Sequence, residues 1–152
     1  MSYVNRIIDA VGLRLKEQYP DVLITSEEVE QIRNVLPYFF IMARSGGGGR
    51  SKLYEYLFRN EVVIDYLVNP DMPKKHEHLQ DVVENLIIEL ERVTDMEGEP
   101  YHAVFDSQKY EVFESSVRFN VTYEYKVYAR PSKSPERPER MEVLDLDTRI
   151  GE

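Results

Sequence analysis

The stretch that decides the fold is Val117–Val127, which reads VRFNVTYEYKV. Apolar or aromatic side chains alternate along it with polar ones from the first residue to the last. Successive side chains of a strand point to opposite faces of the sheet, so this alternation assigns each set to its own face. The stretch therefore predicts a long antiparallel strand with one buried side and one side in water.

The segment upstream of that strand has a different period. Between Pro73 and Thr94, apolar residues recur at i, i+3, i+4 and i+7, and polar residues occupy the opposite face. This spacing predicts a helix over Pro73–Thr94 with an apolar stripe facing the sheet. Leu86 on the helix and Phe119 on the strand are expected to be buried core residues.

The remaining elements follow from shorter patterns. Helical spacing predicts a first helix over Tyr3–Tyr19, with Ser2 as its N-cap and Pro20 ending it. Residues 51–60 fit either a helix or a strand, and the aromatic residues of Leu53–Val68 favour a strand. The other expected strands are Val22–Thr25, Pro37–Ala43, Tyr101–Asp106 and Lys109–Glu114.

This order of elements predicts an α+β fold: an antiparallel (mixed) sheet with two helices packed on it and a long hairpin with a glycine-rich tip. We expect residues 1–130 to form a single domain. Residues 131–152 lose all periodicity and contain three prolines, at 131, 135 and 138, so they are expected to form a flexible polar tail. We expect deletion of this tail to leave the melting transition unchanged.

The segment Ser45–Ser51, SGGGGRS, is the most unusual part of the chain. A phosphate-binding loop ends in Gly-Lys-Ser/Thr and has another glycine five positions before that ending, whereas this chain has Arg50 in place of the lysine and Arg44 in place of the upstream glycine. Four glycines instead suit either a flexible hairpin tip without a partner or a loop that becomes ordered on meeting one. Replacing both arginines by glutamate is expected to preserve the fold and to weaken docking. The candidate partner-docking loop is Arg44, Gly46, Gly47, Gly48, Gly49 and Arg50.

No catalytic, cofactor or metal site is expected. His76 and His78 are two residues apart and diverge on a helix, whereas zinc ligands on one helix are usually four apart, and His102 is distant in sequence. The tyrosines at positions 54, 56, 66, 123, 125 and 128 lack the interleaved basic residues of a nucleic-acid stacking surface, so they are interpreted as sheet or interface residues.

Composition excludes several classes of protein. The chain has 152 residues, a formal net charge of −9 and no cysteine, which argues against general nucleic-acid binding, disulfides and thiolate metal sites. No apolar run approaches the roughly 20 residues that span a bilayer, and no signal peptide is recognised. We therefore expect a cytoplasmically made protein that folds by packing alone.

Three segments carry a family resemblance, which as a whole covers residues 3 to 129. They are VNRIIDAVGLRLKEQYPDV (4–22), PYFFIMARSGGGGRSKLYEYLFRNEVVIDYLV (37–68) and YEVFESSVRFNVTYEYKVYA (110–129). Their order resembles the tail terminator, or tail completion, proteins of long-tailed bacteriophages and prophages: an opening helix, a strand pair with a mobile tip, and a closing hairpin.

The resemblance implies a structural protein of the virion tail, assembled in the host cytoplasm. It implies a homo-oligomer, a hexameric ring, that caps the tail tube protein, presents a face to the head connector protein and lets DNA pass through its lumen. The alternatives are a head–tail connector or stopper protein of the same particle, a small nucleotide-binding enzyme that uses the glycine loop, and a monomeric binding module.

Overall fold

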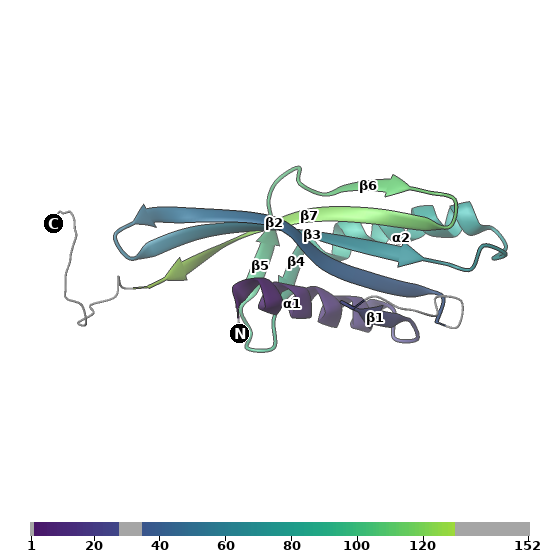
Figure 1. The fold of residues 1–152 in the computed structure, drawn as a ribbon, viewed down its shortest axis with the longest axis horizontal. Coiled ribbons are helices and arrows are strands. Elements are labelled where there is room, and N and C mark those ends of the chain that lie inside the picture. The colour runs from purple at the N-terminus through teal and green to yellow at the C-terminus, as the bar shows by residue number, and fades with distance from the viewer. Residues whose placement is uncertain (1, 28–34, 130–152) are drawn as a thin grey trace. The chain divides into compact units, whose positions relative to one another are not determined.

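The computed structural model of the chain describes residues 2–27 and 35–129 (Figure 1). The described residues divide into two compact units. The first unit contains the residues up to Gly48 together with Phe58–Tyr125, and the second contains Gly49–Leu57 and the residues from Lys126 on. The tail expected at 131–152 lies outside the described residues, so the domain boundary stays a prediction.

The first unit contains two helices and most of one mixed sheet. In chain order the elements are α1 (Tyr3–Gln18), β1 (Leu23–Thr25), β2 (Tyr38–Lys52), β3 (Glu55–Leu67), α2 (Lys75–Glu89), β4 (Arg92–Thr94), β5 (Pro100–Ala103), β6 (Lys109–Val112) and β7 (Ser116–Tyr128). The order along the sheet is β1-β2-β3-β7-β5-β4, and β6 also pairs with β7. β1 runs parallel to β2, whereas β4 with β5, and β5 and β6 with β7, are antiparallel pairs. The predicted α+β class is therefore confirmed.

The patterns of the first helix and of the last strand form the elements that they predict. In α1 the Ser2 hydroxyl caps the first turn by accepting the Asn5 backbone N–H at 3.3 Å, and the helix stops two residues before Pro20. In β7 burial alternates as the sequence does, so Val117 and Phe119 are buried. This alternation is the reason that β7 packs one face into the core.

The second helix is shorter than predicted. α2 ends at Glu89, and Arg92–Thr94 pairs with β5 instead, with Val93 opposite Tyr101. Leu90 and Val93 are fully buried, as helical spacing predicted, but they belong to a helix cap and a strand. The Tyr123 hydroxyl donates to the Leu90 carbonyl at 2.6 Å and thereby satisfies an acceptor that the helix end leaves open.

The glycine run lies within a strand. β2 continues from Tyr38 to Lys52, and the turn to β3 is formed by Leu53 and Tyr54. We predicted that the strand would end at Ala43 and that the glycines would form the hairpin tip. Residues 55–60 lie in β3, which resolves the ambiguity there in favour of a strand.

A single hydrophobic core joins the helices to the sheet. Leu86 and Phe119 are both fully buried in it, as predicted. α1 packs against both β1 and β4, which are the two ends of the sheet order, so the sheet curls around this helix (Figure 1). The helix residues of the core are Ile7, Ala10, Val11 and Leu15 from α1, and Leu79, Val82, Val83 and Leu86 from α2.

Candidate functional site

Arg44 of the predicted docking loop is engaged within the sheet. Its guanidinium forms two hydrogen bonds to the Glu61 carboxylate of β3, Nε to Oε1 at 3.2 Å and an η-nitrogen to Oε2 at 3.1 Å. Asn120 on β7 donates to the same carboxylate at 3.1 Å. The Arg44 hydrogen bonds, followed by the one from Asn120, hold the pKa of Glu61 below its usual range. Arg44 therefore ties β2 to β3 in the first unit.

Gly46 is held by close approach of its neighbours. A side-chain carbon added there would collide with the Asn60 amide nitrogen and lie 3.1 Å from the Arg59 carbonyl oxygen. The Asn60 side chain is fixed, because its Oδ1 accepts the Tyr125 hydroxyl at 2.7 Å. Gly47, in contrast, faces open space. Gly46 is therefore a required glycine, whereas Gly47 and Gly49 meet no such obstacle.

Arg50 belongs to the second unit, unlike Arg44. It is solvent-exposed, and the next residue, Ser51, donates to the Glu55 carboxylate at 2.7 Å. That hydrogen bond is the main reason that the pKa of Glu55 is lowered. The Ala129 backbone N–H donates to the Tyr54 carbonyl at 3.0 Å, so the residue that follows β7 lies against this turn. Of the two predicted docking arginines, Arg44 is thus engaged in an ion pair of the first unit, whereas Arg50 is an exposed residue of the second unit.

A carboxylate organises the turn between β4 and β5. Asp95 is buried, yet its oxygens accept the backbone N–H groups of Glu97 and Glu99 at 2.9 and 3.0 Å and the Tyr101 hydroxyl at 2.9 Å. Arg6 of α1 adds an ion pair at 3.0 Å. Burial opposes ionisation, but these contacts outweigh it and lower the pKa of Asp95. The turn is thereby fixed against α1, with Met96 exposed at its tip.

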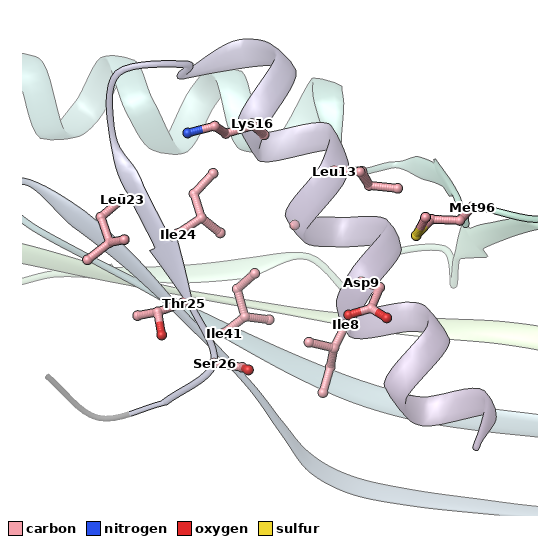
Figure 2. Close-up of a pocket in the computed structure, with 11 residues that line it drawn as sticks. Ile8, Asp9, Leu13, Lys16, Leu23, Ile24, Thr25, Ser26, Ile41 and Met96 are labelled. Carbon is pink, nitrogen blue, oxygen red and sulfur yellow. The ribbon is translucent and has the colours of Figure 1, made fainter. Parts of the chain in front are cut away.

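An apolar groove of about 480 Å³ lies beside this turn (Figure 2). Ile8 and Leu13 of α1 line one side, and Leu23 and Ile24 of β1 line the other. Met96 also contributes to the wall, so the Asp95 turn shapes the groove. Two charged residues, Asp9 and Lys16, lie on α1 at its border. Such an open apolar depression can receive a side chain of another protein.

The histidines are dispersed. His78 Nε2 lies 2.8 Å from the Tyr66 hydroxyl, and burial raises the pKa of Tyr66 to about 12. His102 lies on β5, opposite Arg92 and Glu124 in the sheet register. Within residues 2–27 and 35–129, no three histidine, cysteine or acidic residues are grouped so as to hold a metal ion. In the same part of the chain no helix is long and apolar enough to cross a membrane.

Two of the tyrosines that we interpreted as sheet residues lie deep in the structure. Tyr66 and Tyr123 are buried in the core, and burial raises the pKa of Tyr123. Tyr125 stacks on Phe58 and makes a tilted contact with Tyr3, with ring centroids 5.6 Å apart in each case. These rings therefore serve the packing of the sheet and α1.

The groove did not follow from the sequence. Leu13 lies off the apolar stripe of the first predicted helix, Leu23 lies in a short predicted strand, and Met96 occurs in a turn. The available signal was the presence of large apolar residues at positions where a predicted helix or turn should face water.

Comparison with known proteins identifies the chain through its sequence family. The family described as phage tail terminator protein matches residues 6–135. No curated protein matches the chain.

Proposed function

Since this chain belongs to the phage tail terminator protein family and is accordingly a component of the virion tail, we propose that it caps the tail tube as a ring and provides the surface to which the head docks. The observation that carries this proposal is the family match, which extends over nearly all of the described residues. We further propose that the ring is a homo-hexamer assembled in the host cytoplasm.

The edges of the sheet support an oligomer. Among the described strands, β1 and β4 end the sheet order, and β6 pairs with β7 alone. Open strand edges attract other chains unless something covers them. In a ring, neighbouring copies cover such edges while leaving two faces free, one for the tail tube protein and one for the head connector protein.

The acidic balance supports passage of DNA through the ring. With a formal net charge of −9, the chain repels the phosphate backbone on average. A lumen built from such chains lets DNA move without adhering to it.

The exposed turn between β2 and β3 supports a docking role for Arg50. On an acidic protein, a cation near a strand turn speeds the encounter with an acidic partner more than it tightens the complex. Arg44 is unsuited to the same test, because a glutamate there would face Glu61 and destabilise the sheet. We therefore choose Arg50→Glu alone as the test of docking, and that the exchange of both arginines preserves the fold stays a prediction.

Deletion of the gene from the phage, with and without complementation, tests the proposal. Without the chain we expect tail tubes of irregular, excessive length and no joined heads in electron micrographs, and complementation should restore both. Mass spectrometry of separated tails and heads distinguishes the alternatives, because a terminator is found on tails and a stopper on heads. Tails of normal length in the absence of the chain would contradict the capping function.

A further inference from the structure

The turn between β5 and β6 presents a phenylalanine to solvent. Phe105 is 96% exposed, although a side chain of this size gains much from burial. An aromatic side chain held in water on an anchored turn can act as the anchor that a pocket of a partner buries.

The turn itself is well anchored. The Ser107 N–H donates to the Val104 carbonyl at 3.1 Å, and the Val104 N–H donates to the Thr122 carbonyl of β7 at 2.8 Å. The Ser107 hydroxyl also accepts the Thr122 N–H at 3.2 Å. Asp106 has φ 62°, a left-handed conformation that aspartate tolerates in turns. The backbone that carries Phe105 therefore has little conformational freedom to lose on binding.

The groove between α1 and β1 offers a matching surface elsewhere on the same unit. It is lined by apolar side chains, and Leu13, Leu23 and Met96 are exposed on its walls. In Figure 1 the β5–β6 connection lies above the strands, whereas α1 and β1 lie below them. One copy therefore does not fill its own groove with its own Phe105.

We propose that Phe105 of one copy inserts into the α1–β1 groove of the next copy, and that this contact links neighbours around the ring. The inference rests on the proposed function. A ring needs two different, complementary surfaces on every chain, since a head-to-tail contact repeats until the rotation closes. An exposed aromatic residue and an apolar groove on one unit meet that need.

The charges beside each surface are complementary. Asp106 follows Phe105 directly, and Lys109 lies three residues after Asp106. Asp9 and Lys16 border the groove two helical turns apart. Each surface thus carries one charge of each sign, and in the proposed contact Asp106 is placed toward Lys16 and Lys109 toward Asp9. A second copy of the chain is therefore the partner that we assign to the groove.

Disulfide trapping in assembled tails tests the contact, because the natural chain has no cysteine. A chain carrying both Phe105→Cys and Leu13→Cys, supplied to a phage that lacks the gene, should give a ladder of covalent multimers on a non-reducing gel after mild oxidation. The matched control combines Phe105→Cys with Ile88→Cys, because Ile88 is exposed on α2 outside the groove. Each single-cysteine chain should stay monomeric on the gel, since the contact joins unlike surfaces.

A second variant measures the strength of the contact. Phe105→Ser should leave the fold unchanged and weaken association about 10- to 100-fold, which is the effect of leaving one such side chain unburied. If the double-cysteine chain is present on tails but cross-links no more than the control, the proposed contact is wrong while the terminator function stands. A link from Leu13→Cys to the tube protein, or dimers of Phe105→Cys alone, would likewise overturn the contact and leave the terminator function standing. Absence of the chain from tails would overturn the proposed function and this contact with it.

Discussion

Two adjacent glycines on β2 should respond in opposite ways to the same substitution. Gly46→Ala places a carbon against the Asn60 amide and 3.1 Å from the Arg59 carbonyl, whereas Gly47→Ala places one in open space. Neither glycine has a left-handed φ, so alanine fits the backbone at both sites. The pair therefore isolates the cost of the close approach.

The magnitude follows from the contacts. Overpacking costs about 1–3 kcal/mol, and moving Asn60 weakens its 2.7 Å hydrogen bond from Tyr125, which contributes about 0.5–1.5 kcal/mol. Alanine in place of glycine returns about 0.4–1 kcal/mol by restricting the unfolded chain. We therefore expect Gly46→Ala to lower the free energy of unfolding by about 1–3 kcal/mol, and Gly47→Ala to raise it by up to about 1 kcal/mol.

Urea titration followed by far-UV circular dichroism measures both variants, because the chain has no tryptophan to report unfolding. A double-mutant cycle tests whether Asn60 is the cause. In an Asn60→Ala background, Gly46→Ala should lower the free energy of unfolding much less than in the natural chain. If Gly46→Ala and Gly47→Ala unfold within about 0.5 kcal/mol of each other, the close approach does not constrain the strand and the reasoning fails.

Four further outcomes are expected. Leu86→Ala and Phe119→Ala should each lower the free energy of unfolding by about 2–5 kcal/mol in urea titrations, since both side chains are fully buried, and a loss below about 0.5 kcal/mol would contradict this. Because the pKa of Asp95 is lower in the folded state, its stabilising contribution is complete above the unfolded pKa of about 4 and disappears as pH falls through the folded value, so Asp95→Asn should flatten that part of a pH–stability curve. Deleting 131–152 should leave the melting temperature unchanged by calorimetry, and a large drop would mean that this segment packs on the core. Arg50→Glu should preserve the melting temperature and reduce the yield of joined, infectious particles, and a normal yield would remove the docking role.

The sequence predicted the elements better than their ends. Alternation in β7 and helical spacing in α2 are repeated signals, so the class of the fold followed from them. The end of α2 did not follow, because Leu90 and Val93 continue the helical spacing while the pairing of β4 with β5 decides their conformation. Over a segment as short as Leu90 to Val93, the same apolar residues fit a helix or a strand, and tertiary contacts decide which conformation forms.

The docking residues were harder to predict, because their environment depends on distant partners. Arg44 looked free in the sequence, yet it is paired with Glu61, which lies 17 residues away across the hairpin. Gly46 looked interchangeable with its neighbours, yet Asn60 makes it the constrained member of the run. Neither fact follows from local composition, since each depends on the register that places β2 against β3.

The two surfaces that we propose to meet between copies are fixed by different devices. Ser107 and Thr122 anchor the turn that carries Phe105, whereas the Asp95 carboxylate anchors the turn that carries Met96. A weak contact repeated around a ring gains most when neither surface has to be ordered on binding, because the ordering cost would otherwise recur at every interface. A buried carboxylate with its hydrogen bonds satisfied is therefore as relevant to assembly as the exposed phenylalanine, although it touches no partner.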